Sequence, residues 1–167
     1  APSSGRSVVK PEITTDFIRS LPKTDLHVHL DGSIRIKTLI DLARDYSVDL
    51  PSYTEEGLRE LVFKDRYNSL GDYLKGFAYS VAVMQSEVAL ERIAYEFAID
   101  NFSEGVRYFE VRFAPQLHVH QHMNTVMVLK AVNRGLTRAK NEYNQRRYSR
   151  YCSRRNARTH PSINAWF

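Results

Sequence analysis

Residues 21–33 read Leu-Pro-Lys-Thr-Asp-Leu-His-Val-His-Leu-Asp-Gly-Ser, and this stretch decides the fold. Its alternation of polar and apolar residues predicts a strand at residues 23–30, which an Asp-Gly turn ends. Because the side chains of a strand point alternately to its two faces, we expect Asp25, His27 and His29 to share one face. The opposite face then carries three apolar side chains, those of Leu26, Val28 and Leu30.

The two histidines have the spacing of a metal site. The imidazoles of His27 and His29 lie one pleat apart at the end of a strand and can bind one ion between them, and neutral imidazole is a common zinc ligand. The same spacing also fits two histidines that are solvated or hydrogen-bonded. From the residues alone, both interpretations stay open.

The rest of the chain predicts several helices and one more strand. Apolar residues at helical spacing, together with capping residues, predict helices at about residues 15–20, 36–46, 55–63, 70–84, 87–103 and 125–144. A second strand is predicted at residues 106–114, with Phe109, Val111 and Phe113 on one face and Tyr108, Glu110 and Arg112 on the other. The order strand, helices, strand, helix favours a right-handed parallel β-α-β connection.

Three further blocks accompany residues 21–33. They read Leu70-Gly-Asp-Tyr-Leu-Lys-Gly-Phe77, Arg92-Ile-Ala-Tyr-Glu-Phe97 and Glu104-Gly-Val-Arg-Tyr-Phe-Glu-Val-Arg-Phe-Ala-Pro115. In this order and spacing, the four blocks resemble the adenosine deaminase family of the amidohydrolase superfamily, over about residues 15–144. The resemblance implies an α/β fold, the N-terminal portion of a (β/α)8 TIM-type barrel. We expect this barrel to be incomplete in a chain of 167 residues, because such barrels usually need about 250.

The resemblance also assigns roles to individual residues. It implies that His27 and His29 are two ligands of a catalytic Zn²⁺ ion and that Asp31 contacts the 5′-hydroxyl of a nucleoside. The substrate-binding set that it implies is His29, Asp31, Leu70, Tyr73, Leu74 and Phe77, the last four as an apolar patch over the purine. From spacing alone, Asp31 is favoured as a turn residue and the patch as core packing.

The implied function is zinc-dependent hydrolytic deamination of adenosine and 2′-deoxyadenosine to inosine and ammonia, with a purine nucleoside as the substrate. No catalytic residue is identified in this chain, because the family's proton-transferring Glu and His belong to later segments that are not found here. We therefore expect the chain alone to be an incomplete or inactive fragment. The alternatives are a related purine deaminase, acting on adenine, modified adenine or AMP, and a non-catalytic truncated product.

Charge and domain boundaries are linked in this sequence. Residues 145–167 hold six of the 24 basic residues and no acidic one, which leaves 18 basic against 19 acidic residues in 1–144. The net charge of +5 therefore belongs to the tail, and nucleic acid is disfavoured as a partner. We expect a flexible arm at 1–14, the half-barrel at 15–144, and at 145–167 an aberrant or disordered tail from an out-of-frame or alternative ending.

Several classes are disfavoured by what the sequence lacks. No apolar run approaches the roughly 18 residues of a membrane span, and the single Cys152 suits a reducing cytoplasm, where we expect the protein. One cysteine also cannot supply the Pro-Cys-x-x-Cys of the other nucleobase deaminases. A loop with His118, His120 and His122 is expected to be exposed to solvent. The residues favour no particular oligomeric state.

Overall fold

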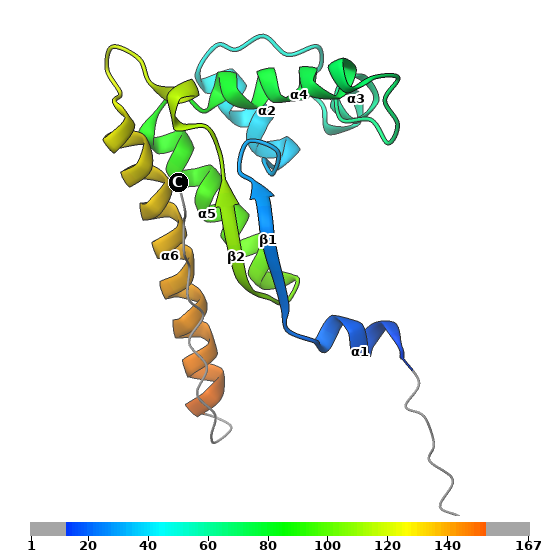
Figure 1. Cartoon of the computed structure of the whole chain (residues 1–167), viewed down its shortest axis with the longest axis vertical. Coiled ribbons are helices and arrows are strands. Elements are labelled where there is room, and N and C mark those ends of the chain that lie inside the picture. The colour runs from blue at the N-terminus through cyan, green and yellow to red at the C-terminus, as the bar shows by residue number, and fades with distance from the viewer. Residues whose placement is uncertain (1–12, 153–167) are drawn as a thin grey trace, which may run out of the picture.

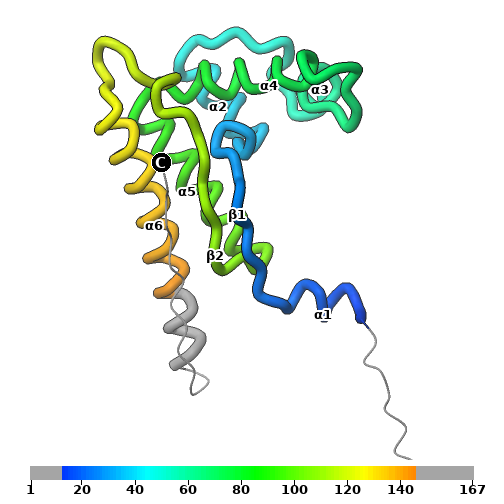
Figure 2. The backbone as a smooth tube through the Cα atoms, viewed as in Figure 1, coloured from blue at the N-terminus to red at the C-terminus, as the bar shows by residue number. Residues whose placement is uncertain are grey.

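The computed structural model describes residues 13–152 and is built around two parallel strands (Figure 1). Strand β1 (Lys23–His29) pairs with β2 (Val106–Arg112), and the connection between them is helical. Helices α5 (Glu87–Ser103) and α6 (Thr125–Cys152) lie side by side next to β2, as the backbone trace in Figure 2 also shows. The predicted parallel β-α-β connection is confirmed.

The other helices separate into two groups. The remaining helical elements are α1 (Thr15–Ser20), α2 (Ile36–Asp45), α3 (Glu55–Leu61), α4 (Leu70–Val83) and the 3₁₀ helix η1 (Pro115–His118). Helix α1 precedes β1 and extends away from the sheet, whereas α2, α3 and α4 gather beyond the carboxyl end of β1 (Figure 1). The insertion between the strands therefore lies over the end of the sheet at which barrel enzymes bind substrates.

Capping residues set the helix boundaries where the sequence predicts them. Thr54, Ser69 and Ser86 each accept a hydrogen bond of 3.1 Å from a backbone N–H in the first turn of the helix that follows. Gly105 follows α5 with a φ of +87°, a conformation that a side chain would strain. These predicted starts and the predicted end of α5 are confirmed.

One part of the core lies between β2 and the pair formed by α5 and α6, and the buried cluster continues into α2, α3 and the end of α4. Phe109 of β2 is fully buried and meets Phe97 of α5 edge to face, with ring centroids 5.1 Å apart. The two helices approach closely at Gly135 of α6, where an added Cβ would collide with the carbonyl oxygen of Glu91. The predicted apolar face of β2 is thus packed against helices, as expected of the outer face of a barrel strand.

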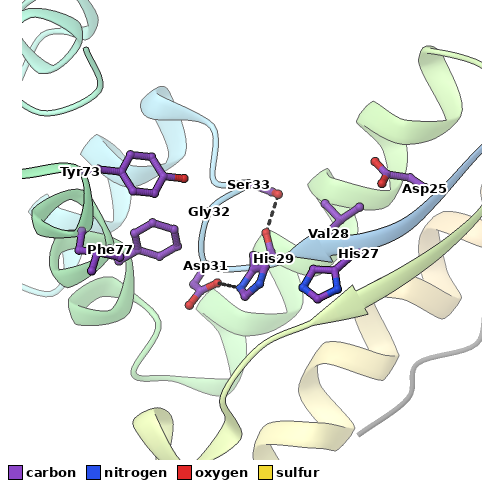
Figure 3. A pocket seen from close by; sticks show the side chains of 10 residues that line it. Asp25, His27, Val28, His29, Asp31, Gly32, Ser33, Tyr73 and Phe77 are labelled. Atoms are coloured by element: carbon purple, nitrogen blue, oxygen red, sulfur yellow. Dashed lines mark hydrogen bonds and ion pairs between the residues drawn. The ribbon is translucent and has the colours of Figure 1, made fainter. Parts of the chain in front are cut away.

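Strand β1 departs from simple alternation. Asp25 lies opposite Phe109 and Val28 lies opposite Val111, so β1 has one more residue than β2 between these pairs. An extra residue of this kind interrupts the alternation of the strand. Side chains before it therefore point to the face opposite the one that simple alternation predicts. Asp25 therefore points away from the rings of His27 and His29 (Figure 3), and the prediction that all three share one face is wrong for Asp25.

The same irregularity affects two further expectations. Leu26, predicted on the covered apolar face, is 57% exposed. Opposite charges on neighbouring strands would suit an ion pair between Asp25 and Arg112, but none joins these two residues in the part of the chain that the structure describes. The register explains this, because Arg112 pairs with His29 on the other face of the sheet.

Helix α6 continues to Cys152, so the helix end predicted near Asn144 is wrong. The predicted arm falls mostly in residues 1–12 and the predicted tail mostly in 153–167, and both of these ranges lie outside the described residues. The domain boundaries at 15 and 144 stay predictions. Neither α6, despite its 28 residues, nor any other described helix has the length and apolar content needed to cross a bilayer.

Candidate active site

A pocket of about 630 Å³ opens at the carboxyl end of β1 (Figure 3). Its volume lies within the range of small-molecule sites, roughly 300–1,000 Å³. The lining residues come from β1, from the turn that follows it, and from α4: Asp25, His27, Val28, His29, Asp31, Gly32, Ser33, Tyr73, Leu74 and Phe77. The structure therefore brings together every predicted site residue except Leu70.

The rings of His27 and His29 lie on the same side of β1, with centroids 5.3 Å apart and planes inclined by 41°. Zinc–imidazole bonds are about 2.0–2.1 Å long, so two imidazoles at a tetrahedral angle have centroids roughly 5 Å apart. The observed separation fits two rings that share one ion. Among the described residues there is no group of three or more potential ligands, so this part of the chain offers two.

The turn after β1 fixes His29. The backbone N–H of Leu30 donates to the carbonyl of Arg112 at 2.9 Å, and the Ser33 hydroxyl donates to the carbonyl of His29 at 2.6 Å. The Nδ1 atom of His29 lies 3.5 Å from Oδ1 of Asp31, whose side chain is only 11% exposed. A carboxylate in this position can orient an imidazole whose other nitrogen binds a metal.

Aromatic side chains of α4 form the wall opposite the histidines. The rings of Tyr73 and Phe77 meet edge to face at 5.5 Å, and Tyr67 meets Tyr73 in the same way at 5.1 Å. Phe77 also lies against Gly32, where an added Cβ would be 3.4 Å from its ring. An apolar wall that faces two imidazoles across an open pocket is a suitable surface for a flat aromatic ligand.

Leu70 differs from its predicted partners. It is the first residue of α4, is 72% exposed and does not line the pocket. Its helical spacing to Tyr73, Leu74 and Phe77 places it on their side of the helix but beyond the end of the pocket. The structure therefore does not bring Leu70 to the site.

Sequence reasoning missed His118. This residue ends η1 and is 1% exposed, whereas the loop that carries it was expected to be exposed; His120 and His122 are exposed, as expected. Burial lowers the pKa of His118, opposed by a hydrogen bond to the backbone of Met84 and by the negative charge of Asp31. Nothing in a His-x-His-x-His pattern tells which imidazole a 3₁₀ turn directs into the protein.

The lowered pKa of His118 predicts a loss of stability in acid. The unfolded chain takes up a proton near pH 6.5, and the folded chain takes it up only at lower pH, so the free energy of unfolding falls as pH drops below about 6.5. Between pH 7 and 5, His118→Gln should lose less of this free energy than the wild type. Urea unfolding at several pH values measures the two slopes, and equal slopes would contradict the assignment.

Comparison with known proteins identifies relatives of this chain. The family model for adenosine deaminase matches residues 22–164. The adenosine deaminase of Shewanella halifaxensis is 45% identical over 124 residues, which make up 74% of this chain and 38% of that protein. The chain spans less than two fifths of the length of the curated relatives that it matches.

Two solved structures support the fold. An N6-mAMP deaminase from Arabidopsis is 31% identical with a TM-score of 0.59, over 74% of this chain and 36% of that one. A zinc-bound amidohydrolase from Burkholderia ambifaria has a TM-score of 0.63 at 22% identity, over 83% and 38% of the two chains. These are barrel deaminases and amidohydrolases, which confirms the predicted partial α/β barrel. With the family match over most of its length, the chain belongs to the adenosine deaminase family.

Proposed function

We propose that this chain contributes the metal-binding and nucleoside-binding part of a zinc-dependent enzyme of purine metabolism, which hydrolyses adenosine and 2′-deoxyadenosine to inosine and ammonia. The observation that supports this most is the composition of one pocket. It combines the imidazoles of His27 and His29 with the carboxylate of Asp31 and the aromatic wall of α4. Family membership supports the reaction class.

Each group in the pocket has a distinct task in this proposal. His27 and His29 are the residues that would hold the zinc ion. When bound, zinc would supply a hydroxide near neutral pH for attack at C6 of the purine, because it lowers the pKa of water to about 7. The carboxylate of Asp31 orients the ring of His29 and accepts a hydrogen bond from a sugar hydroxyl.

The aromatic wall positions the base and keeps water from it. Tyr73 and Phe77 present ring surface to the pocket, and Leu74 adds an apolar side chain beside them. Stacking of a purine on these rings would orient C6 toward the histidines. The hydroxyl of Tyr73 gives this wall one polar atom at the edge of the pocket.

Proton transfer to the purine is not assigned to any described residue. Glu110 faces the expected barrel interior, but its carboxylate accepts a hydrogen bond of 3.0 Å from Tyr108 and does not line the pocket. The proposal therefore requires an acid–base group and further zinc ligands beside those of residues 13–152.

A chimera tests the proposal. In the Shewanella halifaxensis adenosine deaminase, the 124-residue segment that aligns with this chain is replaced by the corresponding residues of this chain. We expect the chimera to release ammonia from adenosine in a zinc-dependent manner, and the 167-residue chain alone to release none, with or without zinc. A folded chimera without activity would contradict the proposal, and turnover by the chain alone would refute its need for further groups.

The role of Asp31 predicts a change in substrate preference. In the chimera, Asp31→Ala should lower the ratio of kcat/KM for adenosine to kcat/KM for 5′-deoxyadenosine by about ten- to a hundredfold, since one hydrogen bond to a charged group is worth about 1.5–3 kcal/mol. Steady-state kinetics with both nucleosides measures this ratio. If Asp31 is only a turn residue, both substrates lose equally and the ratio stays constant.

A second candidate function is deamination of a modified adenine nucleotide. The observation that favours it is the 31% identity to a solved N6-mAMP deaminase. A carboxylate at the sugar end of the pocket argues against it, because Asp31 would repel a 5′-phosphate. The measured quantity is the ratio of activity on N6-methyl-AMP to activity on adenosine. A higher ratio in the chimera than in the parent Shewanella enzyme would favour this candidate.

A further inference from the structure

Two buried polar side-chain atoms have no hydrogen-bond partner among the described residues. They are Oδ1 of Asp31 and Nδ1 of His118. The two residues are 9% and 1% exposed. An unsatisfied buried acceptor costs about 1–3 kcal/mol, so two such atoms in one region call for a common explanation.

The backbone places these atoms in the same region. Asp31 follows the end of β1, where Leu30 is hydrogen-bonded to Arg112 of β2. From Arg112 the chain leads through Phe113 to η1, and the rings of Phe113 and His118 lie 5.9 Å apart. The charge of Asp31 acts on the imidazole of His118, which agrees with this placement.

The ring of His118 is held from the side of α4. The hydrogen bond of the ring to the backbone of Met84 anchors it just after the last residue of that helix. The neighbouring Leu117 is fixed in the same place, because Nε2 of Gln85 donates to its carbonyl at 3.1 Å. The ring therefore has little freedom to turn toward another partner.

Counting protons shows what can lie between the two atoms. A neutral imidazole has one N–H, and the bond to Met84 favours the protonated nitrogen, so the ring donates there and Nδ1 is an acceptor. The carboxylate oxygen of Asp31 is also an acceptor. Two acceptors cannot bond to each other, but a water molecule can donate one hydrogen to each.

We propose that His118 is a positioning residue for Asp31, and that one buried water bridges its Nδ1 atom to Oδ1 of Asp31. The bridge fixes Oδ1 of Asp31 toward the interior, where this oxygen is also 3.5 Å from Nδ1 of His29. The second carboxylate oxygen of Asp31 is then directed toward the pocket. It links the end of α4, which carries the aromatic wall, to the carboxylate below it. The inference deepens the proposed function and rests on it only for the identity of the ligand that Asp31 meets.

Long-range ¹H–¹⁵N correlation spectra of the full 167-residue chain, labelled with ¹⁵N-histidine and free of metal, test the bridge. His118→Gln identifies the His118 signals by their loss. We expect a neutral ring protonated at Nε2, with an Nδ1 resonance that shifts in the isosteric variant Asp31→Asn. Asp25→Asn is the matched control, because Asp25 lies on β1 with its side chain pointing away from the two histidines, and its replacement should leave that resonance in place.

Three results would overturn the inference: a ring protonated at Nδ1, an imidazolium at neutral pH, or equal shifts in the Asp31 and Asp25 variants. None of these readouts needs zinc or catalysis, so an inactive chimera with the predicted spectra would refute the proposed function alone.

Discussion

Replacing His27 by Ala in the chimera is expected to lower kcat/KM for adenosine at least about a thousandfold, because the ion that generates the nucleophile loses a ligand. The ring of His27 is 5.3 Å from that of His29, and no third potential ligand joins them among the described residues. The imidazole of His29 that remains in this variant cannot by itself hold the ion as the two imidazoles together would. Ammonia release and zinc content after dialysis measure the loss, and both should fall together.

His120→Ala is the matched control for this experiment. His120 is an exposed imidazole whose Nε2 lies 3.0 Å from the carbonyl of Gln85, outside the pocket. Its replacement should leave zinc content unchanged and kcat/KM within about twofold. If His27→Ala keeps its zinc and its activity, or if His120→Ala loses them, the assignment of the ligands is wrong.

Gly135→Ala is expected to destabilise the fold by about 3 kcal/mol or more, at or above the upper end of the usual cost of overpacking. A Cβ at this position would collide with the carbonyl of Glu91 and would lie 2.8 Å from the backbone nitrogen of Tyr95. Both are backbone atoms of α5, so no side-chain rotation can make room. The two helices would have to separate along this contact, which also includes the buried Ala94.

Gly71→Ala controls for the general effect of alanine in a helix. The nearest atom to an added Cβ at Gly71 is the Ser69 hydroxyl at 3.8 Å, and intrinsic helix propensity favours Ala over Gly by about 1 kcal/mol. This variant should be neutral or more stable than the wild type. Urea unfolding followed by circular dichroism compares the two, and equal midpoints for both variants would contradict the close helix contact at Gly135.

Local signals in the sequence were enough to predict most of the elements. Thr54, Ser69 and Ser86 predict helix starts because a side-chain oxygen that satisfies an N–H of the first turn acts within three residues. The pairing of the strands follows from the long helical connection between them. The candidate histidines were found because their spacing in a strand is itself local.

The misses concern features that depend on distant residues. The extra residue of β1 between Asp25 and Val28 is visible only from the register with β2, so the face of Asp25 could not be read from alternation. The burial of His118 is a tertiary feature, since its ring is hydrogen-bonded to the backbone of Met84, far away in sequence. The exposure of Leu70 depends on where the pocket ends along α4, which helical spacing does not tell.

The central claim is that His27 and His29 bind one zinc ion beside the purine pocket, and anomalous diffraction tests it most directly. Crystals of the chimera measured on both sides of the zinc absorption edge locate the ion. We predict one peak about 2.0–2.1 Å from a ring nitrogen of each of the two histidines. A zinc peak elsewhere in the molecule, with the rings of His27 and His29 bound to no ion in an active enzyme, would contradict it.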